Sequence, residues 1–252
     1  MSRRLARFVG FAAALTACLA APPPSPAAPR HGAESMLEPH TASVLVDYFE
    51  TFLRDKDIEA FHRGVMARYS EGTLARLARS GTPQSRRAAF LALGMMGTFQ
   101  INEVVARGLR DQDPTVRNLA QNALWAIWFR ADTPENNAVL LEVRDLIGRE
   151  RMGEAIELAT RLIARSPGFA EAYNQRAIAL FAMNRHAESA LDCNRVLQRN
   201  PYHVWALSGL GGCYLRLDRR SDALATFRRA LTIQPFSADL RDTVEALEGK
   251  VD

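Results

Sequence analysis

The residues that could do chemistry are few and lie far apart along the chain. Among 252 residues there are five histidines, none with a cysteine or carboxylate neighbour at ligand spacing. A metal site needs three or four converging side chains, and the common nucleophile, metalloprotease and phosphate-loop motifs are absent. The sequence therefore predicts a protein that is not an enzyme and that holds no metal or cofactor. The histidines are His31, His40, His62, His186 and His203.

The first 17 residues have the composition of an export signal. Arg3, Arg4 and Arg7 are followed by an apolar run from Phe8 to Ala17. This run is too short to span a bilayer, which takes about 20 residues, but it suits the apolar region of a signal peptide. Without these three arginines the formal charge falls from +4 to +1. We therefore expect no nucleic-acid partner, because phosphate binding needs a concentrated basic surface.

The apolar run ends in Leu15-Thr16-Ala17-Cys18, which resembles the lipobox of bacterial lipoproteins. The resemblance implies cleavage of a signal peptide at residues 1–17 and a lipid anchor on Cys18. The protein would then be exported to the periplasm or cell envelope and held at a membrane. Two alternatives stay open, namely secretion with cleavage near Ala20 or Ala21, and an uncleaved anchor.

Residues 18–40 read as a linker. Five of the eight residues from Pro22 to Pro29 are proline. Proline cannot propagate a helix because it lacks the amide donor, and proline-rich segments extend as semi-rigid spacers. We expect this segment to separate a membrane anchor from the folded body.

From residue 41 onward the apolar residues recur at helical spacing, and no segment alternates as a strand would. The sequence therefore predicts an all-α protein. Short helices are expected around three apolar groups: Val44, Leu45, Tyr48, Phe49 and Phe52; Ile58, Phe61, Val65 and Met66; Leu74 and Leu77.

Two segments offset by 31 residues predict a first kind of repeat. Thr82-Pro83-Gln84-Ser85-Arg86 aligns with Asp113-Pro114-Thr115-Val116-Arg117. Each begins with a helix-capping residue and a proline at the first helical position. The pattern resembles short HEAT-like repeats, including those of bilin lyases, in which the arginine stitches successive helix pairs. We assign residues 41–132 to HEAT-like helical repeats.

A second repeat has a period of 34 residues. Pro167, Pro201 and Pro235 are spaced by that distance, the period of tetratricopeptide repeats (TPRs). Small residues such as Gly211 and Ala223 and the large Phe227 also match the TPR signature, whereas Arg176 departs from it. The resemblance implies TPR units at 136–169, 170–203 and 204–237 within a domain at 133–252, closed by a capping helix at 238–249. Both repeat types would stack as one α-α superhelical solenoid, with Trp125 and Trp128 packing the junction.

The TPR resemblance also implies a binding site along the concave groove. The positions that line this groove in TPR arrays are occupied here by apolar, arginine and asparagine side chains that suit a peptide. The lysine and asparagine clamp of chaperone cochaperones is not reproduced. The residues expected to bind a peptide are Arg144, Asn174, Phe181, Trp205, Ser208 and Arg216.

Cys193 and Cys213 fall at repeat positions that point into the layer between two units. The sequence leaves open whether they form a disulfide or are two small buried side chains.

The predicted function is a noncatalytic scaffold or adapter at the bacterial cell envelope that binds a protein or peptide partner. Two alternatives stay open. One is an enzyme or chromophore-handling protein related to bilin lyases, and the other is a structural subunit of an obligate complex. The sequence does not determine the oligomeric state or the identity of the partner.

Overall fold

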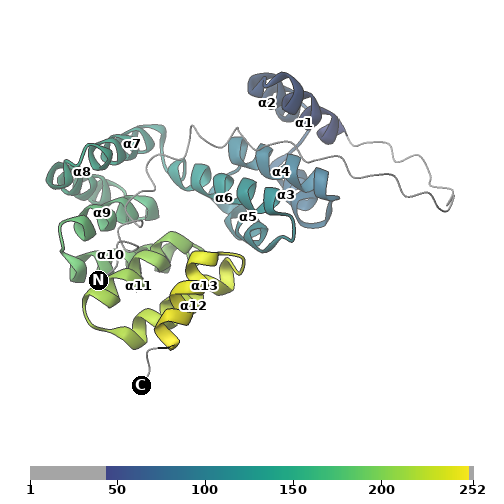
Figure 1. The fold of residues 1–252 in the computed structure, drawn as a ribbon. Coiled ribbons are helices and arrows are strands. Elements are labelled where there is room, and N and C mark those ends of the chain that lie inside the picture. Colours follow the sequence, from purple (N-terminus) through teal and green to yellow (C-terminus); the bar gives the residue numbers. More distant parts are fainter. Residues whose placement is uncertain (1–43, 250–252) are drawn as a thin grey trace. The chain divides into compact units, whose positions relative to one another are not determined.

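A computed structural model describes residues 44–249 (Figure 1). The described residues belong to one compact unit. The predicted signal peptide, Cys18 and the proline-rich linker lie outside them, so those assignments stay predictions.

The all-α prediction is confirmed, since the described residues form thirteen α-helices and no strand. The first six are α1 (Val44–Asp55), α2 (Ile58–Met66), α3 (Glu71–Ser80), α4 (Pro83–Met96), α5 (Asn102–Arg107) and α6 (Pro114–Phe129). Short 3-10 helices at Phe99–Ile101 and Gly108–Arg110 flank α5. The remaining seven are α7 (Pro134–Gly148), α8 (Met152–Arg165), α9 (Ala170–Ala182), α10 (His186–Arg199), α11 (Val204–Arg216), α12 (Arg220–Ile233) and α13 (Ala238–Glu248).

The two aligned segments of the N-terminal half begin α4 and α6 as predicted. Thr82 and Asp113 are the N-caps, and each accepts a backbone N–H of the first helical turn. Arg86 donates to both carboxylate oxygens of Asp111, at 2.7 and 2.9 Å, and so ties α4 to the turn before α6. The predicted arginine stitch is therefore present, while the HEAT-like assignment stays a prediction.

The C-terminal half is built from helix pairs that repeat every 34 residues. The pairs α7–α8, α9–α10 and α11–α12 coincide with the three predicted units. Glu150, Asn184 and Asp218 adopt left-handed backbone with φ of 57–60°, and each ends the first helix of its pair. The backbone thus has the same 34-residue period as the prolines. The predicted closing helix is α13, which buries Leu240, Val244 and Leu247.

Close approach of α11 and α12 depends on Gly211. A Cβ atom at this position would lie 2.7 Å from Cζ of Phe227, closer than carbon atoms pack. We expect Gly211→Ala to lower the free energy of unfolding by about 1–3 kcal/mol, as overpacking does. The matched control is Gly148→Ala in α7, where a Cβ would meet nothing within 4 Å. Urea unfolding should show the control to be neutral or slightly stabilised, and equal losses in both variants would contradict this account of the packing.

Helix α6 lies along the turns that join successive repeats. At its C-terminal end Trp128 is stacked on His203, with ring centroids 4.0 Å apart. Further back, Gln121 accepts a hydrogen bond from Gln234, and near its start Arg117 lies over the ring of Phe236 at 4.2 Å. The 16-residue helix is about 24 Å long, and it contacts the α10–α11 and α12–α13 turns in reverse order.

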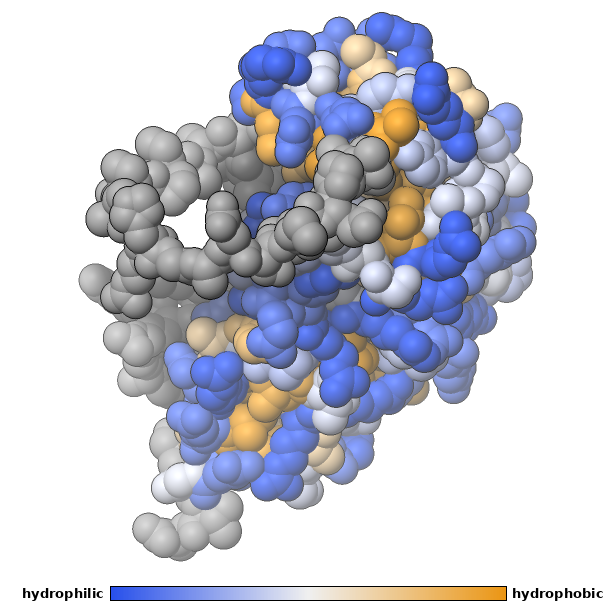
Figure 2. All heavy atoms as spheres, turned by 90° about the vertical axis from the view of Figure 1, so that its right-hand side faces the viewer, coloured by the Kyte–Doolittle hydropathy of each residue, from blue (hydrophilic) through white to orange (hydrophobic). Residues whose placement is uncertain are grey.

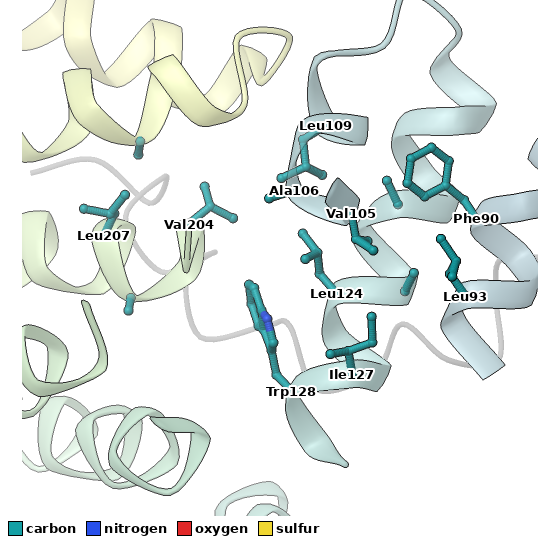
Figure 3. Close-up of a cluster of buried hydrophobic side chains, with 14 of the residues drawn as sticks. Phe90, Leu93, Val105, Ala106, Leu109, Leu124, Ile127, Trp128, Val204 and Leu207 are labelled. Atoms are coloured by element: carbon teal, nitrogen blue, oxygen red, sulfur yellow. The ribbon is translucent and has the colours of Figure 1, made fainter. Parts of the chain in front are cut away.

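Trp128 is the centre of this contact. Figure 3 shows its side chain between α6 and the helix that carries Val204 and Leu207, and it is 2% exposed. Trp125, one turn earlier, stacks on Phe129 with ring centroids 4.1 Å apart. The prediction that both tryptophans pack the junction between the halves is confirmed.

Candidate functional site

Three of the six predicted binding residues are engaged by the chain itself. The Arg144 guanidinium lies 4.3 Å from the centroid of the Trp125 ring. Trp205 meets Trp128 edge to face, with centroids 5.0 Å apart. Asn174 is buried, and its Nδ2 donates to Glu171 Oε1 at 2.8 Å. The N-terminal ends of α7, α9 and α11 are therefore occupied by α6 and by buried polar contacts.

The other three predicted residues lie toward the C-terminal ends of α9 and α11. Phe181 is half-buried, and a Cβ atom on Gly212 would lie 3.7 Å from its ring, so the two helices meet there. Ser208 is half-buried and Arg216 is exposed. Ile178, one turn before Phe181, is 42% exposed. We call Ile178, Phe181, Ser208, Leu215 and Arg216 the α9–α11 face.

Arg216 supplies the positive charge of the α9–α11 face at neutral pH. His186 lies beside this face, with its ring 4.9 Å from that of Phe181. Burial, together with the positive charge of Arg216, lowers the pKa of His186 below its ordinary value. The imidazole is therefore neutral near pH 7.

A buried polar network, not predicted from the sequence, joins α9 to the start of α11. Both Glu171 and His203 are almost fully buried, and His203 Nε2 lies 2.9 Å from Glu171 Oε2. Asn174 and Gln175 donate to the other oxygen of Glu171, at 2.8 and 2.7 Å. A signal for this contact was available, because a 34-residue repeat brings the starts of α9 and α11 side by side.

The Glu171–His203 pair has no imidazole nitrogen left for acid–base work. His203 Nδ1 accepts the Ala206 backbone N–H at 3.0 Å, as the N-cap of α11. Its Nε2 must then carry the proton, which it donates to the Glu171 carboxylate. Both nitrogens are used inside the protein, so the pair positions α11 and leaves the imidazole without a free lone pair.

The network continues from Trp128 to the turn before α11. Trp128 Nε1 donates to Asn102 Oδ1 at 2.6 Å, and Asn102 Nδ2 donates to Asn200 Oδ1 at 2.8 Å. Asn200 is fully buried. The two asparagines are 98 residues apart, and nothing in the sequence pairs them.

The two repeat-domain cysteines are buried and unbonded. Cys213 Sγ donates to Ser189 Oγ at 3.2 Å, and Cys193 Sγ packs against Gly209 at 3.4 Å from where a Cβ would stand. Each thiol is therefore level with a different residue of the facing helix. Within residues 44–249 no three His, Cys, Asp or Glu side chains gather as a metal site would need. No helix in that range is long and apolar enough to cross a bilayer.

A family model assigns the repeats of the C-terminal half. The tetratricopeptide repeat model matches residues 140–204 and 194–238. Residues 140–238 consist of TPRs. A TPR-containing protein of Rhizobium etli is 24% identical over 152 residues, which is 60% of this chain and 74% of that protein.

Several solved TPR structures are similar to this chain. The first TPR of Spaghetti (RPAP3), bound to an HSP90 peptide, is 19% identical with a TM-score of 0.45, covering 47% of this chain and 94% of that one. The Sgt2 TPR domain of Aspergillus fumigatus is 22% identical with a TM-score of 0.45, covering 48% and 82%. The TPR2AB domain of yeast Sti1 in complex with HSP90 is 18% identical with a TM-score of 0.42, covering 82% and 95%. Their ligands belong to those proteins and are not transferred to this chain.

Arg176, the residue that departs from the TPR signature, forms a half-buried ion pair. It donates to both oxygens of Asp192 on α10, at 2.7 and 2.9 Å. These hydrogen bonds raise the pKa of Arg176. Arg195 donates to the same carboxylate at 2.9 Å, and Asp192 itself is 1% exposed. A charged contact between α9 and α10 thus stands where TPRs usually have an apolar one.

Asp132 makes the junction before the first TPR sensitive to acid. Burial alone would raise the pKa of Asp132, but hydrogen bonds from Ser166, the Thr133 N–H and Asn136 bring it below its ordinary value. A lowered pKa in the folded state means that the carboxylate stabilises the fold above about pH 4. This stabilisation is lost as the pH falls through the folded pKa.

We therefore expect the urea midpoint of the wild type to fall more between pH 7 and pH 3 than that of Asp132→Asn. Other carboxylates are common to both proteins and cancel in the comparison. Equal falls in the two proteins would contradict a stabilising role for the charged form of Asp132.

Proposed function

We propose that this protein is a noncatalytic interaction scaffold and that it binds a segment of a partner polypeptide on the α9–α11 face. The observation that carries the proposal is the contrast between the two ends of these TPR helices. Toward their N-terminal ends the predicted binding residues contact α6 or are buried. Toward their C-terminal ends Ile178, Phe181 and Arg216 present apolar and cationic groups that no described element covers.

Exposure alone does not select this face. Large apolar side chains are exposed at several places on the described surface, and Figure 2 shows apolar side chains in separate small patches on a mostly hydrophilic face of the molecule. Scattered exposed apolar residues are normal. The α9–α11 face differs because its members come from neighbouring first helices of a TPR array, whose inner surface is the extended binding surface of such solenoids.

The chemistry of the face suits a polypeptide segment with an apolar anchor and an acidic group. Ile178 and Phe181 offer apolar contact, Ser208 lies between them and the Trp205 end, and Arg216 can pair with a carboxylate. Arginine and aromatic side chains are frequent among the residues that dominate binding energy.

Site-specific photo-crosslinking in the native host tests this proposal. A photoreactive residue at Ser208 should give a discrete adduct, and the same residue at Ser221, exposed in the first turn of α12, should give none. Mass spectrometry of the adduct would name the partner. Adducts of equal yield from both positions, or from neither, would contradict binding on this face.

We also propose that the scaffold is held at the bacterial cell envelope by a lipid on Cys18. The basic start, the short apolar run and the lipobox-like Leu15-Thr16-Ala17-Cys18 support this location. Metabolic labelling with an alkyne fatty acid should label the wild type and leave Cys18→Ser unlabelled. An unlabelled wild type whose mature N-terminus lies near Ala20 would contradict the anchor.

A further inference from the structure

A small pocket lies where α6 meets the start of α9 and the α10–α11 turn. Its volume is about 100 Å³, roughly three times the ~30 Å³ that one molecule occupies in liquid water. Most of its wall is apolar, and the polar part comes from the buried network. The lining includes Phe99, Trp128, Phe169, Glu171, Asn200 and His203.

The orientation of the Asn200 amide in this wall is determined by its neighbours. An indole N–H can only donate, so the hydrogen bond from Trp128 Nε1 fixes Oδ1 of Asn102 as the acceptor. The Nδ2 of Asn102 must then donate to Asn200 Oδ1, which also accepts the Tyr202 backbone N–H at 3.2 Å. Turning the Asn200 amide over would set donor against donor twice.

This arrangement leaves one donor of Asn200 unused. Asn200 is fully buried, and its Nδ2 has no hydrogen-bond partner among residues 44–249. A buried donor without an acceptor is costly, and native proteins nearly always satisfy such groups. Asn200 lines the pocket, so an acceptor bound there would satisfy it.

The N-terminus of α9 adds further donors to the same wall. Its N-cap, Phe169, has no side chain that accepts a backbone N–H. The N–H groups of the first turn of a helix have no partner within the helix, and Ala170 and Glu171 of this turn line the pocket. The pocket is therefore rich in donors that face an acceptor.

The charges around the pocket favour a neutral acceptor over an anion. The Glu171 carboxylate lies in the wall, and a bound anion would be repelled by it. The Arg199 side chain also lines the pocket, but it is committed to the carbonyl oxygens of Pro167 and Arg195, each at 2.8 Å.

We propose that this pocket binds a neutral carbonyl group of the carboxamide class. The carbonyl oxygen accepts from Asn200 Nδ2, and the apolar part of the ligand lies against Trp128 and Phe99. Such a group could belong to a peptide bond of a partner chain or to a free small amide, and both present the same chemistry to the pocket. The site is separate from the α9–α11 face and does not depend on the proposed function.

Titrations followed by NMR test the proposal, with the Asn200 side-chain amide as the reporter. The probes are acetamide for a free amide, N-acetylalanine N-methylamide for a peptide bond, and acetate for an anion. We expect at least one amide to shift the Asn200 Nδ2 resonances saturably at millimolar concentration, and acetate to bind at least tenfold more weakly. The tighter of the two amides identifies the source of the carbonyl.

Two variants separate binding from folding. Asn200→Asp removes the donor and keeps both acceptor contacts, and Ala131→Phe adds bulk at an exposed lining residue without touching the network. With the Trp128 and His203 resonances as reporters, both variants should abolish amide binding. Ala225→Phe, at an exposed position of α12, should leave it unchanged. Acetate binding as tight as amide binding, or no saturable shift with either amide, would overturn the proposal.

Discussion

Replacing Trp128 with alanine should lower the free energy of unfolding by about 4 kcal/mol, the usual cost of removing a buried tryptophan. For a chain of this size the melting temperature should fall by about 10 °C. The effect is large because one side chain serves three contacts. The indole stacks on His203, meets Trp205 edge to face, and donates to Asn102 Oδ1.

The conservative variant Trp128→Phe separates packing from hydrogen bonding. It keeps an aromatic ring against His203 and loses the donor to Asn102, so we expect roughly half the loss of the alanine variant. Thermal and urea unfolding followed by circular dichroism measure both. A loss below about 1 kcal/mol for Trp128→Ala would mean that α6 does not stabilise the TPR turns.

The second large effect is expected at Asp192. Asp192→Ala leaves Arg176 without its partner in a half-buried site, and breaking such pairs costs about 3 kcal/mol. The side chain of Arg176 is 15% exposed and that of Asp192 is 2% exposed, so solvent replaces little of the lost interaction. Arg195 is freer to turn toward water, because 48% of its side chain is exposed.

A double variant shows what the pair contributes over an apolar contact. Arg176→Met combined with Asp192→Leu replaces both charges with apolar groups, and such replacements are often neutral or stabilising. We expect the double variant to lie within about 1 kcal/mol of the wild type by urea unfolding. Additive losses from the two single changes would contradict a coupled ion pair.

The repeat architecture could be predicted because the 34-residue period is imposed by local geometry. Prolines at the inter-repeat turns and small residues such as Gly211 serve contacts within one repeat or between adjacent repeats. The same locality made Arg176 recognisable as a departure from the TPR signature. Its partner Asp192 lies 16 residues away, one helix further along the chain.

The contacts of α6 could not be predicted, because they join residues far apart in the sequence. Gln121 and Gln234 are 113 residues apart, and no periodic pattern specifies such a pair. The predicted binding residues Arg144 and Trp205 therefore pointed to a surface that α6 partly covers. Prediction from repeat position alone assumes an uncovered inner surface, and this chain covers part of it with its own N-terminal half.

The measurement that tests the central claim most directly is the yield of the Ser208 photo-adduct in two matched variants. Ile178→Asp places a charge on the α9–α11 face, and Leu191→Asp places one on α10, where the leucine is 59% exposed. Both replace an exposed apolar side chain, so their effects on folding should be similar. We predict that the adduct falls about tenfold in Ile178→Asp, equivalent to about 1.4 kcal/mol of binding free energy, and is unchanged in Leu191→Asp. Equal yields in the two variants would contradict binding of a polypeptide on the α9–α11 face.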